Sequence, residues 1–251
     1  MTTSLAHSGM APNDAVAHRP WPVIVGGALA RAPRARGTFV PSEDFRSLDD
    51  FGTTVTFSRN ETIFNEGDSA KYAYKLVSGA VRLCKLMADG RRQITEFYLE
   101  GDMFGFLDLD SYDFSAEAIT NVVVMRYARN HLKHVEERDG DLQRELANML
   151  HQRLSRTNAL LVMLGRQTVK ERIASFLIQM AERLEGEALE AACIDLPMGR
   201  QDIADYLGLT IETVCRALSE LKRAGVIGVP TTHQIVVNDI ETLRAIIDGD
   251  N

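Results

Sequence analysis

Apolar and polar residues alternate in short runs between about residue 51 and residue 128. Turn signals such as Asp89-Gly90 and Gly101-Asp102 separate the runs, because glycine adopts positive φ without steric cost. Short, evenly spaced strands predict an antiparallel barrel or roll. The predicted strands are Val55–Phe57, Ile63–Phe64, Tyr72–Val77, Val81–Leu86, Ile94–Leu99, Ala116–Ile119 and Val122–Tyr127.

After Arg129 the apolar period becomes helical. Leucine and methionine recur three, four or seven positions apart, without proline or an interior glycine: Leu142, Leu146, Met149, Leu150, Leu154, Leu161 and Leu164. The stripe can pack on its own β domain or pair with the same helix of a second subunit, with Arg144, Glu145, Arg153 and Arg156 beside the seam. We favour the second arrangement, which makes these seven residues a homodimer interface.

The C-terminal elements follow in the order of a winged helix-turn-helix. They are an amphipathic helix at Thr168–Arg183, a short apolar piece at Cys193–Leu196, a helix pair around Gly208, a strand-like segment at Val226–Val237 broken by Pro230, and a helix at Asp239–Ile247. The sequence thus predicts an α+β protein with a flexible extension (1–40), an antiparallel β-roll (41–138), a dimerisation helix (139–166) and a winged helix-turn-helix (167–251).

Composition places the chain among globular proteins. Its 251 residues are 45% hydrophobic and 25% charged. No apolar run is long enough for a membrane span and the first thirty residues lack a signal-peptide pattern, so we expect a cytoplasmic protein without membrane contact. The net charge of −7 argues against binding polyanions through bulk charge alone.

The helix pair around Gly208 carries the functional signal. Gly208 permits a sharp turn, and Thr210 is placed to cap a second helix that begins at Ile211. The free amides at that end can accept a DNA phosphate. Contacts with the DNA backbone are expected from this motif, at Arg200, Gln201, Thr210 and Thr213.

Glu212, Cys215 and Arg216 share the outward face of the second helix near its start. A carboxylate can accept a hydrogen bond from cytosine N4 and an arginine can donate to guanine, so Glu212 and Arg216 can read base edges in the major groove. The alternative is a solvated i,i+4 salt bridge. The surrounding helix-turn-helix and wing favour base reading.

These motifs make the chain resemble the CRP/FNR family of bacterial transcription regulators over about residues 45 to 248. The resemblance rests on three segments: Ser78–Val81, Glu100–Gly105 and Leu209–Arg216. The resemblance implies a cyclic-nucleotide-binding-like roll, a homodimer on palindromic double-stranded DNA, and RNA polymerase as partner. Glu212 followed by Arg216 is similar to the FNR branch, which implies TTGA…TCAA-type half-sites. Cys215 stands where that branch usually has serine, and Ile211 where the CRP branch usually has arginine.

The two effectors common in the family are not expected here. A cyclic nucleotide needs an arginine against its phosphate, but Phe114 stands at the matching position, and Asp108, Asp110 and Asp113 add like charge. An iron–sulfur cluster needs four thiolates, whereas the chain has three cysteines: Cys84, Cys193 and Cys215. His131 and His134 have no further ligands nearby. The remaining resemblance is to the FixK-type subgroup, which implies an effector-independent activator in the low-oxygen response, with no cofactor and no enzymatic activity.

Cys215 suggests direct redox control. The adjacent Arg216 favours the reactive thiolate, and oxidation would put negative charge or steric bulk at the DNA surface. The alternative is that Cys215 is simply a small residue that fits. Two other functions stay open: the same fold as a small-molecule-dependent regulator, and a cyclic-nucleotide-binding subunit that acts on a protein.

Overall fold

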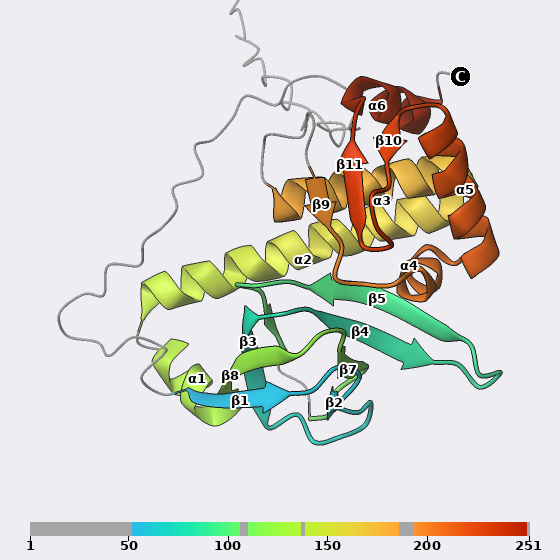
Figure 1. The fold of residues 1–251 in the computed structure, drawn as a ribbon. Coiled ribbons are helices and arrows are strands. Elements are labelled where there is room, and N and C mark those ends of the chain that lie inside the picture. Colours follow the sequence, from blue (N-terminus) through green and yellow to red (C-terminus); the bar gives the residue numbers. More distant parts are fainter. Residues whose placement is uncertain (1–51, 106–109, 137–138, 186–192, 250–251) are drawn as a thin grey trace, which may run out of the picture. The chain divides into compact units, whose positions relative to one another are not determined.

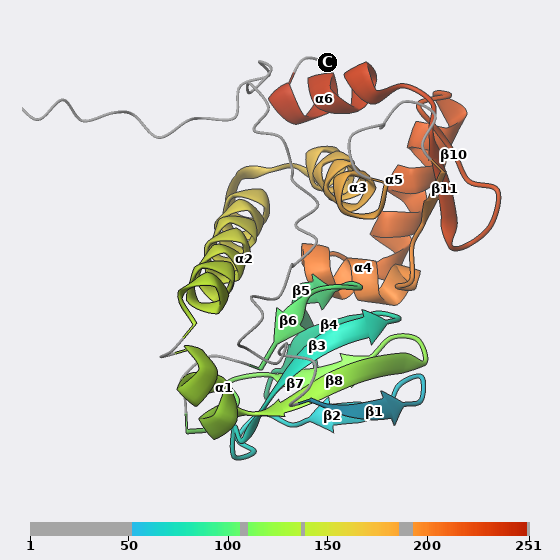
Figure 2. The same cartoon turned by 90° about the vertical axis from the view of Figure 1, so that its left-hand side faces the viewer.

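The computed structural model describes residues 52–105, 110–136, 139–185 and 193–249. The extension predicted for residues 1–40 lies outside them. The N-terminal strands are β1 (Thr53–Phe57), β2 (Thr62–Phe64), β3 (Tyr72–Ser78), β4 (Val81–Leu86), β5 (Arg92–Tyr98), β6 (Met103–Phe104), β7 (Ser115–Ala118) and β8 (Val122–Ala128). They form two four-stranded antiparallel sheets, ordered β1-β8-β3-β6 and β2-β7-β4-β5 (Figure 1, Figure 2). The predicted roll is confirmed, with β6 as an added strand.

Aromatic rings from both sheets fill the interior of the roll. Phe104 lies at the centre, with ring centroids 5.2 Å from Tyr74 and 5.1 Å from Tyr98. Phe64 stacks on Tyr112 at 3.7 Å. The alternating pattern of the sequence therefore buries one face of each sheet against the other.

Two helices follow the roll: α1 (Arg129–Glu136) and α2 (Gly140–Arg166). The Asp139 carboxylate caps α2 by accepting hydrogen bonds from the backbone N–H groups of Asp141 and Leu142. The 27-residue helix therefore begins within a residue of the predicted boundary. None of the helices in the described ranges is both long and apolar enough to cross a bilayer.

The structure divides the apolar stripe of α2. Leu142 and Leu146 are buried in their own subunit beside Ala73 and Met103 of the roll, and Met149 packs on the same cluster. Leu164 packs against the C-terminal core. Leu142 and Leu146 are thus already buried within the chain, and the dimer interface predicted for the seven residues stays a prediction. The residues that remain exposed are Leu150, Leu154, Leu161 and the neighbouring Val162.

The C-terminal region has the element order of a winged helix-turn-helix. Its elements are α3 (Val169–Leu184), β9 (Cys193–Asp195), α4 (Arg200–Leu207), α5 (Ile211–Arg223), β10 (Ile227–Gly228), β11 (Gln234–Val237) and α6 (Ile240–Asp248). The wing is a three-stranded sheet of order β10-β11-β9, and Pro230 lies in the connection between β10 and β11. The predicted element order is confirmed.

One hydrophobic core continues from the roll into the helix-turn-helix. Phe97 of β5 lies 5.1 Å from Tyr206 of α4 and 6.4 Å from Phe176 of α3, measured between ring centroids. Both views show α4 beside β5 (Figure 1, Figure 2). Strand β5 is thus the part of the roll that supports the first helix of the motif.

Candidate nucleic-acid interface

The turn between α4 and α5 has the geometry that its sequence predicts. Gly208 ends α4 in the left-handed region, at φ 63°, and the backbone N–H groups of Gly208 and Leu209 both donate to the carbonyl of Ala204. The Thr210 hydroxyl accepts a hydrogen bond from the Thr213 backbone N–H at 3.3 Å, so Thr210 caps α5.

Helix α5 presents one buried and one exposed face. Val214, Ala217, Leu218 and Leu221 are buried against the rest of the motif, whereas Glu212, Cys215, Arg216 and Ser219 are exposed. The structure therefore brings the two predicted base-reading side chains together on the solvent face. Within the described residues no ion pair joins Glu212 to Arg216, so the salt-bridge alternative has no support here. Hydrogen bonds from its own backbone N–H and from the Thr210 hydroxyl hold the pKa of Glu212 below its ordinary value, which keeps it an anionic acceptor.

The four predicted backbone contacts lie at the starts of α4 and α5, but their side chains differ in availability. Arg200 is half-buried, and one guanidinium nitrogen, Nη1, is buried without a hydrogen-bond partner among the described residues. Burial lowers the pKa of Arg200, and nearby Cys215 opposes that shift. Gln201 donates from Nε2 to Asp205 Oδ1 at 2.7 Å, and the Thr213 hydroxyl lies 3.1 Å from that of Thr210. Arg200 therefore keeps one donor that no described residue uses, although that nitrogen is buried, whereas Gln201 and Thr213 already have intramolecular partners.

Arg172 of α3 is a supporting residue that sequence reasoning missed. Its guanidinium donates to three carbonyls at helix ends: Gln167 at 3.0 Å, Leu164 at 3.0 Å and Leu207 at 2.9 Å. The first two close the end of α2 and the third closes α4, next to the turn. An arginine on an amphipathic helix carries no sequence signal that separates this role from simple exposure.

The three cysteines lie in different environments. Cys84 is buried in the roll, where desolvation raises its pKa to about 11. Cys193 and Cys215 are exposed. Only Cys215 lies on the recognition face, where its carbonyl accepts a hydrogen bond from the Ser219 hydroxyl at 2.7 Å.

The roll leaves little room for a nucleotide in the part of the chain that the structure describes. One cavity of about 50 Å³ is lined by Phe64, Tyr98, Tyr112, Phe114 and Arg153, among others. A second, of about 90 Å³, lies where Asp102 and Met103 of the roll meet Arg153 and Arg156 of α2. Ligand sites usually enclose several hundred Å³. Lys85, whose Nζ lies 5.6 Å above the Phe114 ring, is paired with Glu66 at 2.9 Å. Asp108, predicted to repel a phosphate, lies outside the described residues. No group of three or more His, Cys, Asp or Glu side chains in the described ranges could hold a metal ion.

Comparison with known proteins matches both halves of the chain. Residues 54–139 fit the family model of the cyclic nucleotide-binding domain, and residues 171–246 fit the Crp-like helix-turn-helix domain. The nitrogen fixation regulation protein FixK of Azorhizobium caulinodans is 39% identical over 96% of each chain. The transcriptional activator protein FnrL of Cereibacter sphaeroides is 30% identical over 80% of this chain and 83% of its own.

A solved structure agrees with these sequence matches. FixK2 from Bradyrhizobium japonicum is 40% identical and superposes with a TM-score of 0.73, covering 78% of this chain and 96% of that one. The chain therefore belongs to the CRP/FNR family of DNA-binding transcription regulators and, within it, to the FixK type.

Proposed function

We propose that the protein acts in the cytoplasm as a homodimeric activator of the low-oxygen response, which binds TTGA…TCAA-type palindromes and recruits RNA polymerase without a small-molecule effector. The carrying observation is that Glu212 and Arg216 are both exposed on a capped α5 and form no ion pair with each other in the described structure. A carboxylate and a guanidinium one turn apart near the start of a recognition helix can contact adjacent base edges. In this proposal Arg200, Gln201, Thr210 and Thr213 contact the DNA backbone.

Packed aromatic rings fill the interior of the roll, which supports a regulator that works without an effector. The stacked pair Phe64 and Tyr112 occupies the interior, and the Tyr112 hydroxyl donates to the Tyr72 carbonyl at 2.7 Å. A ligand would have to displace packed rings and break this hydrogen bond. The alternative is a small-molecule-dependent regulator. It is favoured by one observation: Arg153 lines the roll cavity without an ion pair in the described structure.

Selection of binding sites from random duplexes by purified protein, without ligand, tests the proposal. We expect a TTGA…TCAA-type palindrome to be enriched. Binding that appears only after a small molecule is added would favour the ligand-dependent regulator instead.

We further propose that oxidation of Cys215 inactivates the protein. The thiol is exposed on the DNA-facing side of α5, beside Arg216 and near half-buried Arg200. A sulfinate or sulfonate there would repel phosphate and compete for both arginines, and a disulfide would block the groove. In a DNA-shift assay peroxide should abolish binding by the wild type and spare the Cys215→Ser variant. Equal loss in both proteins would refute redox control at this residue.

A further inference from the structure

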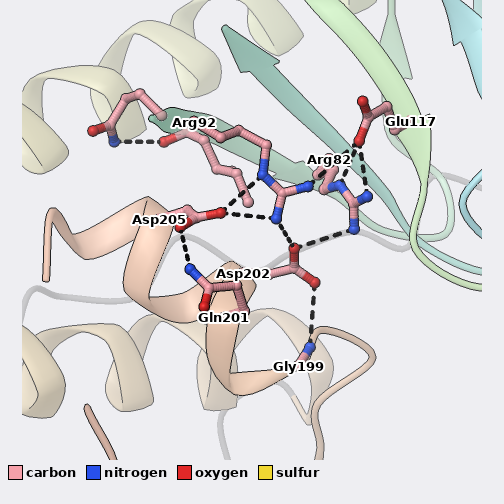
Figure 3. Close-up of polar contacts among 9 residues, drawn as sticks. Arg82, Arg92, Glu117, Gly199, Gln201, Asp202 and Asp205 are labelled. Carbon is pink, nitrogen blue, oxygen red and sulfur yellow. Dashed lines mark hydrogen bonds and ion pairs between the residues drawn. The ribbon is translucent and has the colours of Figure 1, made fainter. Parts of the chain in front are cut away.

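Two arginines of the roll bind two aspartates of α4 (Figure 3). Asp202 Oδ1 accepts from Arg82 Nη1 at 3.1 Å and from Arg92 Nη2 at 2.8 Å. Asp205 Oδ2 accepts from Arg92 Nε at 2.8 Å. Glu117 of β7 completes the group by accepting from Arg82 Nε at 2.8 Å. We call these five residues the α4 clamp.

The clamp is largely removed from solvent. The side chains of Arg82 and Asp202 are only 10% and 11% exposed. Charges with so little water need partners in good geometry. Arg82 binds Glu117 and Asp202 through different nitrogens, and Arg92 binds Asp202 and Asp205. Arg92 Nη1 also lies 3.5 Å from Glu117 Oε2. Because the planar guanidinium fixes the directions of its donors, the clamp favours one orientation of α4 on the roll.

The clamp is separate from the packing within the helix-turn-helix itself. Ile203, Ala204 and Leu207 of α4 are buried in the hydrophobic core, whereas Asp202 and Asp205 point to the roll. The remaining Asp202 oxygen, Oδ2, accepts from the Gly199 backbone N–H at 3.4 Å. The contact with β5 thus reaches the N-terminus of α4, directly beside Arg200 and Gln201.

A regulator that works without a ligand must already populate its DNA-binding conformation, because nothing else shifts the equilibrium between domain orientations. Helix α4 carries the turn and supports α5, so fixing α4 fixes the recognition face. We propose that the α4 clamp replaces an effector by holding the helix-turn-helix of each subunit in its DNA-binding orientation on the roll. This inference rests on the proposed effector-free function. Arg82 and Arg92 act in it as positioning residues that do not touch DNA.

The test compares Arg92→Met with Arg91→Met on the duplex that the wild type selects without ligand. Arg91 is a matched control, because it lies on the same β4–β5 hairpin and pairs with Asp89 in solvent, where the two side chains are 82% and 51% exposed. Both variants lose one positive charge. By fluorescence anisotropy at one salt concentration we expect Arg92→Met to bind about tenfold more weakly or worse, and Arg91→Met to stay within about twofold of the wild type.

Half-site spacing separates positioning from general destabilisation. If the helix-turn-helix is no longer held in one orientation, it can adapt to half-sites that are further apart. Insertion of one central base pair into the palindrome should therefore lower the DNA affinity of Arg92→Met by a smaller factor than that of the wild type. A destabilised variant would instead lose affinity for both duplexes in the same proportion. The near-isosteric Asp205→Asn variant should show the same reduced dependence on half-site spacing. It replaces Arg92→Met in the test if that variant is too unstable to purify.

Three results would overturn the clamp. They are unchanged binding by Arg92→Met and Asp205→Asn, tighter binding by either variant, and a weakening that leaves the spacing penalty at its wild-type value. In each case a wild type that still binds without ligand leaves the proposed function intact. A wild type that needs a ligand would refute both proposals.

Discussion

Glu212 supplies the sharpest prediction at the scale of single residues. Its carboxylate is exposed, anionic and unpaired with Arg216 in the described structure, so it has acceptor capacity for a base. Glu212→Gln should lower discrimination at one position of each half-site by about 1–3 kcal/mol, while binding at the other positions keeps its preference. Competition binding with single-substitution duplexes measures this. Glu220→Gln, the same change near the other end of α5, should leave all preferences unaltered, and equal effects of both variants would argue for bulk charge instead.

Glu96 of β5 gives a prediction on pH. It is buried between Arg156 of α2, at 3.1 Å, and Arg183 of α3, at 3.6 Å. Desolvation raises its pKa despite both arginines. The folded state then binds this proton more tightly than the unfolded state, so stability falls as pH rises from the ordinary glutamate pKa of about 4.3 to the raised value. Urea unfolding at several pH values should show this fall in the wild type relative to Glu96→Gln. If the free energies of unfolding of the wild type and Glu96→Gln differ by the same amount at every pH, Glu96 is not the group that titrates.

Among the contacts between helices, those of Arg172 give a testable prediction on stability, because Arg172 joins the ends of α2 and α4 to α3. Arg172→Met removes three donors at once and leaves carbonyls of Leu164, Gln167 and Leu207 to water. We expect a loss of about 2–3 kcal/mol in the free energy of unfolding, measured by denaturant titration. Lys170→Met is the control, since the Lys170–Glu220 pair at 3.6 Å is largely exposed and should contribute less than about 1 kcal/mol. Similar losses in both variants would contradict the bridging role.

Elements with a local signal were predictable from sequence, and those that depend on distant contacts were not. Thr210, Gly208 and the apolar period of α5 each specify their own geometry within a few residues. Strand β6 is two residues long, too short to show alternation. Arg82 and Asp202 are 120 residues apart, so each alone is typical of a solvated charge. Leu142 and Leu146 fit a dimer seam and an intrachain core equally well until the position of the roll is known.

At the scale of the whole molecule, the net charge is −7, so affinity for DNA depends on where the basic side chains lie and not on bulk charge. Between Gly199 and Gly225 the charges balance: Arg200, Arg216, Lys222 and Arg223 against Asp202, Asp205, Glu212 and Glu220. Two of those acids, Asp202 and Asp205, are neutralised by arginines of the roll and so oppose phosphate less than the count suggests. In the proposed dimer, two helix-turn-helix motifs acting on one palindrome supply the rest of the affinity.

In the proposed function, tight binding therefore depends on dimerisation through α2. Leu154 and Leu161 are 59% and 64% exposed, one face of α2 that a second copy would cover. Changing both to asparagine should leave the subunit folded but weaken the dimer by about 4–6 kcal/mol, because four leucine side chains lose their burial. Sedimentation should show monomers, and affinity for the palindrome should fall toward that for a half-site. Leu86→Asn is the control, since Leu86 is equally exposed but lies on the β4–β5 hairpin, away from α2. If the double variant still forms a dimer, the interface lies on another face of the molecule. Helix α2 would then not set the spacing of the two recognition helices.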